Sequence, residues 1–172
     1  MTLNEYQQKT HETAVYPQEC AKEYLLLGLA GEVGEICNKY KKTIRDSKPI
    51  DKDDMISELG DAMWYVSELC NLYKIELEYC HRSIKLSKNS AFYSLINILN
   101  QTALIANLYE QKRDEIQSGD TINRIRFILE YIYSLCYNFD IDPDEILTKN
   151  IAKLQDRKNR GVIQGSGDNR WP

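Results

Sequence analysis

The sequence predicts an all-α protein, a helical bundle made of tandem antiparallel helix hairpins. Apolar residues recur along most of the chain at alternating spacings of three and four residues, which is the period of one face of an α-helix. The alternation of apolar and polar residues that is typical of a strand is nearly absent. Because 172 residues suffice for one compact core, we expect a single all-α domain over residues 1–172.

A short helix is expected first. Thr2 and Glu5 stand three residues apart in the pattern of a capping box, in which each side chain accepts a hydrogen bond from the backbone of the other. This helix should run to about Thr13, because Tyr16-Pro17 interrupts the chain soon afterwards.

Two long helices follow and form the first hairpin. One spans Glu23 to about Lys42 and the other Asp54 to about Tyr73, and the residues around Pro49 form a loop between them. Since this loop is short, the two helices should lie antiparallel. Their apolar stripes are Leu26, Leu29, Val33, Ile36 and Tyr40, and Ile56, Leu59, Met63, Val66, Cys70 and Tyr73.

The second half of the chain repeats this pattern. Leu95 matches Leu26 at a distance of 69 residues, and Ile125 matches Leu59 in the second stripe at a distance of 66 residues. We interpret this as a degenerate internal duplication: residues 1–86 form an active hairpin unit, 87–147 a degenerate repeat hairpin, and 148–172 a C-terminal helix and tail. The repeated stripes are Leu95, Ile98, Thr102, Ile105 and Tyr109, and Ile125, Leu129, Ile132, Cys136 and Phe139.

A last helix has clear signals at both of its ends. Asp142 supplies an N-cap, Pro143 suits the first helical position, and Glu145 places an acidic side chain in the first turn. The helix should run to about Arg160, and Gly161 should end it.

Composition excludes several classes of protein. The net charge is -4, but the C-terminal segment that begins at Thr148 is basic, so the rest of the chain is more acidic than the total suggests. A nucleic-acid polymer is therefore not an expected partner. Without an apolar run of about 18 residues or a signal peptide, we expect a cytoplasmic protein with no membrane partner. The 5 cysteines form no C-x-x-C pair and are expected to be buried, reduced thiols.

Four acidic residues lie beside the apolar stripes of the first hairpin. Glu32 and Glu35 share one helix face, and Glu58 and Asp61 share a face of the next helix. A hairpin that turns in the loop near Pro49 brings the two pairs level. Four converging carboxylates repel one another unless a cation neutralises them, and an all-oxygen set of ligands favours Mg²⁺ or Mn²⁺. A divalent ion of this kind commonly takes substrate phosphates as further ligands.

Neighbouring residues support a ligand site. Gly31, Gly34 and Gly60 stand beside the acids, although each glycine costs a helix about 1 kcal/mol relative to alanine, so we expect a helix or a ligand to approach the backbone there. Positions on the same stripes hold residues that could bind a nucleotide. Lys39 and Lys42 could meet phosphate oxygens, and Tyr65 could stack on a base.

The second hairpin keeps the apolar stripes and lacks the acids. The positions that match Glu32, Glu35, Glu58 and Asp61 hold Gln101, Leu104, Arg124 and Phe127. Packing alone would need only the stripe, so acids restricted to one copy favour a functional site. The alternative is that the acids form an ordinary solvated helix face.

Two motifs resemble those of a known enzyme family. Leu27-Gly28-Leu29-Ala30-Gly31-Glu32-Val33-Gly34-Glu35, followed by Glu58-Leu59-Gly60-Asp61-Ala62-Met63-Trp64-Tyr65, resembles the double acidic motif of the MazG-like nucleoside triphosphate pyrophosphohydrolases. Near the C-terminus, Asn150-Ile151-x-Lys153-Leu154-x-x-Arg157 and Gly165-x-Gly167-Asp168-x-Arg170 resemble the end of many members. The resemblance covers about residues 1–86 and 148–170.

The resemblance implies Mg²⁺-dependent attack of water on the α-phosphate of a nucleoside triphosphate, which releases a nucleoside monophosphate and pyrophosphate. By matching positions, the four acids would hold the metal, and Glu35 would orient or deprotonate the water. Asn150 and Lys153 would help bind the substrate phosphates, and Tyr65 would lie near the base. The implied role is control of the nucleotide pool.

One departure from the family concerns the order of the segments. In a typical single-unit member the Asn-x-x-Lys segment directly follows the hairpin, whereas residues 87–147 intervene here. Related enzymes, including the dimeric dUTPases, bury such hairpins against a second copy. The degenerate hairpin could supply that partner within one chain, and two chains are then expected to form a homodimer.

The sequence also bears on two other kinds of protein. A di-iron or di-manganese bundle needs two Glu-x-x-His motifs, and the sequence has one, Glu78-x-x-His81. A non-enzymatic helical interaction module, with the acids as a structural acidic face, remains the alternative and predicts no dependence on metal.

Overall fold

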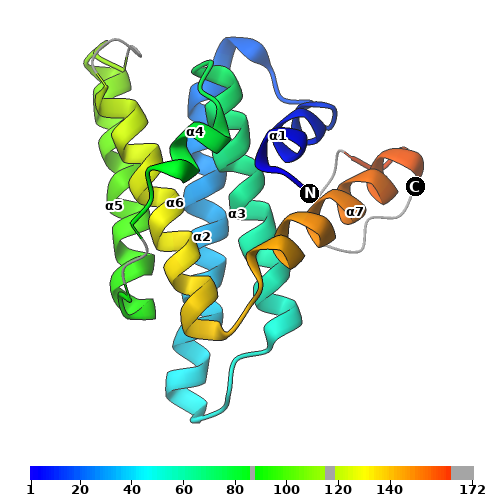
Figure 1. Ribbon diagram of the computed structural model, residues 1–172, viewed down its shortest axis with the longest axis vertical. Helices are drawn as coiled ribbons and strands as arrows, with labels where there is room; N and C mark the ends of the chain where they lie inside the picture. Colours follow the sequence, from blue (N-terminus) through cyan, green and yellow to red (C-terminus); the bar gives the residue numbers. More distant parts are fainter. Residues whose placement is uncertain (86–87, 115–118, 164–172) are drawn as a thin grey trace.

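The chain forms a bundle of α-helices in the computed structural model, which describes residues 1–85, 88–114 and 119–163 (Figure 1). Seven α-helices and one short 3-10 helix lie within these ranges, and no strand occurs among the described residues. The predicted all-α fold is therefore confirmed.

The first helix, α1 (Leu3–His11), begins with the predicted capping box. The backbone N–H of Glu5 donates to the Thr2 hydroxyl at 3.1 Å, and the N–H of Thr2 donates to the Glu5 carboxylate at 2.8 Å. The helix ends two residues before the expected Thr13, whose N–H and hydroxyl both donate to the Thr10 carbonyl in a turn. A 3-10 helix, η1 (Gln18–Cys20), then leads into α2 and was not predicted.

The first hairpin consists of α2 (Ala21–Asp46) and α3 (Lys52–Leu72), which pack antiparallel (Figure 1). Both helices are longer than predicted at their starts. In α3 the N-cap is Asp51, whose carboxylate accepts a hydrogen bond from the Asp54 backbone at 3.1 Å, so the helix begins at Lys52. Ser47, in the left-handed conformation with φ of 50°, ends α2.

The second hairpin, α5 (Ala91–Glu110) and α6 (Asp120–Phe139), packs against the first. In Figure 1, α5 forms an outer edge of the bundle and α6 lies in front of α2. Helix α5 contacts α2, and α6 contacts α3. The apolar stripes of both hairpins lie in one continuous core, in which Ile98, Ile105 and Ile125 are fully buried. Tyr109, at the end of its stripe, is the exception, because its hydroxyl donates to Glu23 at the surface.

The final helix, α7 (Pro143–Asn159), crosses the first hairpin. Asp142 caps its start by accepting a hydrogen bond from the Asp144 N–H at 3.0 Å, and Gly161, with φ of +69°, follows its end as predicted. Helix α7 packs mainly on α3 and also touches α1 (Figure 1). A short helix that was not predicted, α4 (Leu77–Arg82), links the two hairpins.

The cysteines are unpaired. Cys70, Cys80 and Cys136 are buried, whereas Cys20 and Cys37 are partly exposed. None of the described helices combines the length and the apolar character that a membrane crossing requires.

Ile132→Asp should unfold the protein or lower its melting temperature steeply. Ile132 is 1% exposed, and a carboxylate placed there loses its hydration without a partner, which costs several kcal/mol. Tyr137→Asp serves as the control, because Tyr137 lies on the same helix and is 62% exposed. The melting temperature of this variant should barely differ from that of the unaltered protein. Similar melting temperatures for the two variants would contradict a shared core for the two hairpins.

Candidate functional site

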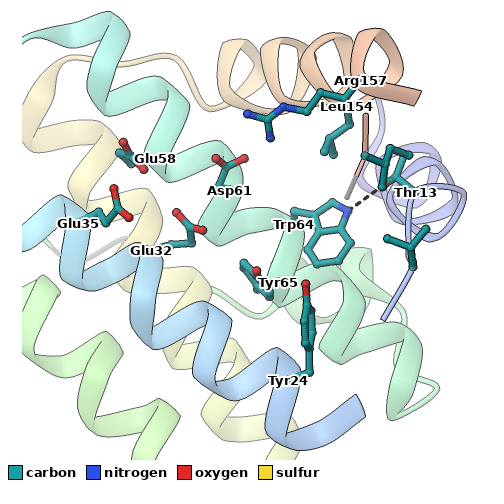
Figure 2. Close-up of a pocket in the computed structure, with 12 residues that line it drawn as sticks. Thr13, Tyr24, Glu32, Glu35, Glu58, Asp61, Trp64, Tyr65, Leu154 and Arg157 are labelled. Carbon is teal, nitrogen blue, oxygen red and sulfur yellow. Dashed lines mark hydrogen bonds between the residues drawn. The ribbon is translucent and has the colours of Figure 1, made fainter. Parts of the chain in front are cut away.

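The first hairpin points its acidic side chains at one another across a pocket. Figure 2 shows Glu32 and Glu35 on α2 facing Glu58 and Asp61 on α3. Carboxylate oxygens of Glu32, Glu58 and Asp61 all lie within 4.8 Å of one another. Glu35 lines the same pocket but does not belong to this close group. Within the described part of the chain, this is the one group of three potential metal ligands at such a distance.

The pocket is open to solvent and has a volume of about 290 Å³. One end is acidic and the other is largely aromatic, so the pocket offers two chemically different surfaces to a ligand (Figure 2). Its lining consists of Thr13, Val15, Tyr24, Glu32, Glu35, Glu58, Asp61, Trp64, Tyr65, Leu154, Arg157 and Ile163.

The acidic end is short of positive charge. Burial, followed by repulsion from Asp61, Glu58 and Glu35, raises the pKa of Glu32 to about 8. Burial also raises the pKa of Glu58, although Lys39 opposes the shift. A divalent cation would remove this repulsion, and the all-oxygen donor set suits Mg²⁺ or Mn²⁺, so the residues present fit a metal ion.

Two lysines border the acids. The Lys39 Nζ lies 2.9 Å from an oxygen of Asp54 and 3.3 Å from Glu58 Oε1. The Lys153 Nζ lies 2.6 Å from Asp61 Oδ2 and also donates to Ser57 at 3.1 Å. Each ammonium group therefore neutralises part of the charge of a potential metal ligand. Lys42 is exposed on α2, three residues beyond Lys39, and lies outside the described lining of the pocket.

Helix α7 joins the site despite the repeat that separates it in sequence. Asn150 is 3% exposed, and its Nδ2 donates to Asp61 Oδ1 at 3.0 Å. Its Oδ1 accepts a hydrogen bond from the Tyr6 hydroxyl at 2.9 Å. Asn150 and Lys153 thus hold both oxygens of Asp61, in the same chain as the acids.

Glycines allow two of the close contacts. A Cβ at Gly60 would lie 3.0 Å from the Cβ of Asn150, so the lack of a side chain lets α7 approach α3, as expected. A Cβ at Gly28, a position that the sequence did not single out, would collide with the ring of Tyr65. Gly31 and Gly34 face open space, so no neighbouring helix accounts for them.

The aromatic end is built from three helices and the segment before α2. The rings of Trp64 and Tyr65 meet edge to face at 5.0 Å, and Tyr24 lies 6.3 Å from Tyr65. The Trp64 indole donates to the Thr13 hydroxyl at 3.0 Å, as the dashed line in Figure 2 shows. Tyr24 is 43% exposed, so part of its ring is open to a ligand.

Sequence reasoning missed several pocket residues. Tyr24 stands eight residues before Glu32, a spacing of about two helical turns that places it on the same face and could have revealed it. Trp64 and Arg157 stood inside the quoted motifs without a role, and Arg157 proves to be only 6% exposed. Thr13 lies between helices, where no periodic pattern predicts its position. Residues Gly165, Gly167, Asp168 and Arg170 of the C-terminal motif lie outside the described residues.

The second hairpin places different chemistry at the matching positions. Arg124, which corresponds to Glu58, donates to Gln101, which corresponds to Glu32, at 3.1 Å. Gln101 is 7% exposed. The first hairpin therefore brings like charges together, whereas the corresponding positions of the second hairpin form a hydrogen bond between a guanidinium and a neutral amide.

Glu32→Gln should remove a pH dependence from the stability of the metal-free protein. The pKa of Glu32 is about 8 in the folded chain and ordinarily 4.5, so the folded state holds an extra proton between these values. The resulting stabilisation is fully present below pH 4.5 and is lost as the pH rises through about 8. Unfolding by urea in a chelator, at several pH values, should show a shallower decline for Glu32→Gln. Parallel curves for the two proteins would contradict the raised pKa.

Comparison with known proteins agrees with this geometry. Residues 21–87, which contain α2, α3 and all four acids, match the family model described as the MazG nucleotide pyrophosphohydrolase domain. The "Gene 37 protein" of Mycobacterium phage L5 is 29% identical in an alignment 180 residues long, gaps included, that covers 99% of this chain and 100% of that protein. No solved structure matches the chain. The family resemblance is confirmed for residues 21–87, which match the MazG nucleotide pyrophosphohydrolase domain.

Proposed function

We propose that the protein hydrolyses a nucleoside triphosphate to the nucleoside monophosphate and pyrophosphate, with Mg²⁺ or Mn²⁺, in control of a cytoplasmic nucleotide pool. One observation carries the proposal: the MazG-matching segment gathers Glu32, Glu58 and Asp61 within 4.8 Å of one another in an open pocket. Three such carboxylates are unfavourable by themselves and suit a hard divalent ion.

Metal binding is assigned to the four acids. Glu32, Glu58 and Asp61 form the close group, and Glu35 stands at its edge in the same pocket. When bound, the ion would neutralise charge on the phosphates and favour ionisation of water. Glu35 lies outside the tight group and is our choice for the base that orients or deprotonates the attacking water.

The phosphates are assigned to the basic and amide groups around the acids. Lys39 and Lys153 already lie within hydrogen-bond distance of Glu58 and Asp61, so a metal ion would release their charge for phosphate oxygens. Asn150 shares Asp61 with Lys153 and fixes the orientation of that carboxylate. Lys42, exposed beyond Lys39, is the outermost of the proposed contacts.

The nucleobase is assigned to the aromatic end. Tyr65 follows Asp61 by one helical turn, and Trp64 and Tyr24 extend the same apolar surface. Aromatic rings stack on the face of any base. This arrangement places the base and the reacting phosphates at opposite ends of one pocket.

The non-enzymatic interaction module explains less of the geometry. A solvated acidic face does not account for Glu58, which is only 7% exposed, or for the convergence of acids from two helices. A di-iron centre is also unsupported, because the His81 ring packs on Tyr133, with centroids 4.9 Å apart, and lies outside the acidic group.

Glu35→Gln should abolish hydrolysis and leave the melting temperature unchanged or higher, because it keeps the volume and removes a negative charge. The assay is release of pyrophosphate and monophosphate from a panel of nucleoside triphosphates with Mg²⁺, separated by ion exchange. Arg124→Ala, at the position that matches Glu58, is the control and should keep nearly full turnover.

Three results would contradict this assignment. Hydrolysis that persists in a chelator would exclude the metal. Release of orthophosphate and a diphosphate would exclude the proposed reaction. A steep fall in the melting temperature of Glu35→Gln would indicate a structural role for that residue.

A homodimer is the proposed assembly. Ile44, Phe92 and Ile96 are between 48% and 67% exposed and border one groove between α2 and α5. Helix α5 also carries a single charged residue, Glu110, which is unusual for a helix at the edge of a bundle. Burial of this face against a second copy would remove the exposed apolar side chains from water.

Phe92→Glu should therefore convert a dimer into a monomer in sedimentation experiments, because the charge would have to be buried in the interface. Phe127→Glu on α6, at a position that is 42% exposed and outside the groove, should leave the mass unchanged. A monomeric unaltered protein, or a dimer that tolerates Phe92→Glu, would refute this interface.

A further inference from the structure

A buried carboxylate outside the acidic site holds several polar groups. Glu68 lies on α3, seven residues after Asp61, and is 0% exposed. Its Oε1 accepts hydrogen bonds from the Thr10 hydroxyl at 3.0 Å and from the Asn71 amide at 2.7 Å. Its Oε2 accepts one from the Tyr16 hydroxyl at 2.9 Å. A carboxylate this deep in a protein is stable only when such partners replace its water.

Most of these partners come from a single segment. Thr10, His11 and Tyr16 lie in residues 10–16, which run from the end of α1 toward η1, and the Nδ1 of His11 is 3.2 Å from Glu68 Oε2. Residues 12–17 of this connection have neither helical nor strand structure. Thr10 and His11 belong to the last turn of α1, whereas Tyr16 lies in the irregular connection, so Glu68 ties both the end of α1 and this connection to α3.

The same segment forms a wall of the pocket. Thr13 and Val15 line it, and the Thr13 hydroxyl accepts the hydrogen bond of the Trp64 indole. The ring of Tyr16 stacks on Tyr24 with centroids 5.3 Å apart. The Tyr16 ring also meets the Trp64 ring edge to face at 6.2 Å. The hydroxyl of Tyr16 is thus bound by Glu68 while its ring supports the aromatic end.

We propose that Glu68 is a positioning residue for the aromatic end of the pocket. Its carboxylate holds residues 10–16 in place, and these residues set the positions of Tyr24 and Trp64. Glu68 is buried and does not belong to the lining of the pocket, so we expect its effect to be confined to the base-bearing part of the ligand. This inference rests on the proposed nucleotide hydrolysis, because the base is assigned to that end.

Glu68→Gln is the sharpest test, since it keeps the shape and replaces one acceptor oxygen with an NH₂ group. The hydroxyl groups of Thr10 and Tyr16, which now donate to the carboxylate, would compete for one acceptor oxygen or face the NH₂ group, which is itself a donor. Residues 10–16, which form this wall of the pocket, should then be held less firmly. The KM for a nucleoside triphosphate should rise about tenfold while kcat stays within about twofold, because a displaced wall weakens binding of the base equally in the ground state and the transition state. Competitive inhibition by tripolyphosphate, which has no base, should be unchanged.

Two further variants separate positioning from stability. Tyr16→Phe removes one donor to Glu68 and keeps the ring, so KM should rise less than in Glu68→Gln. In the double variant the rise in KM should be smaller than the product of the two single effects, because both substitutions disturb the same hydrogen bond. Ile132→Val removes a buried methyl group from α6 and should lower the melting temperature without a change in KM. If Glu68→Gln fails to fold, Tyr16→Phe still tests the proposal.

A binding experiment distinguishes failure of this inference from failure of the proposed function. Trp64 lies in the pocket and is one of the 2 tryptophans of the chain. Replacing the other, in the variant Trp171→Phe, makes Trp64 the single source of tryptophan fluorescence. Quenching of its fluorescence by a nucleoside triphosphate reports binding without turnover. Weaker quenching in Glu68→Gln supports the wall even if no hydrolysis occurs. An unchanged nucleotide affinity, or an equal loss of tripolyphosphate binding, would overturn the proposal.

Discussion

Repulsion among the carboxylates of Glu32, Glu58 and Asp61 is the constraint around which the first hairpin is arranged. Their oxygens lie within 4.8 Å of one another, and the structure compensates for this with cationic and amide groups from outside the group. Lys39 reaches Glu58 from the same helix as Glu32, whereas Lys153 and Asn150 reach Asp61 from α7. Polar contacts with Asp61 therefore contribute to the docking of α7 on α3 in addition to apolar packing.

The helices that the sequence predicts best are those with a long apolar stripe. Both hairpins and α7 follow from periodicity, capping residues and loop positions, and the four acids follow from their spacing on α2 and α3. The boundaries differ where a cap outside the stripe decides them, as Asp51 does for α3. The helix α4 has six residues, which is too short for a periodic pattern to be distinguished.

The aromatic end of the pocket was harder to predict. Thr13 and Val15 belong to a connection whose course depends on a buried carboxylate two turns beyond the acidic motif. Sequence spacing predicts which residues share a helix face, but it does not predict which irregular segment will cover that face. The contacts of Asn150 and Lys153 with Asp61 were not predicted. The family resemblance implied only that these two residues bind substrate phosphates, and the 61 residues of repeat hairpin in residues 87–147 separate them from the acids in sequence.

The hydrogen bond from Tyr6 on α1 to Asn150 on α7 joins two residues that are 144 positions apart in the chain. During synthesis the acids on α2 and α3 leave the ribosome long before α7, and until then Asp61 lacks the side chains that hold both of its oxygens. The nascent hairpin is thus an acidic helix pair that has Lys39 beside Glu58 but lacks the groups that α7 brings to Asp61. The site is completed only when the last helix arrives, so the order of translation itself keeps a partly made chain from presenting a finished pocket.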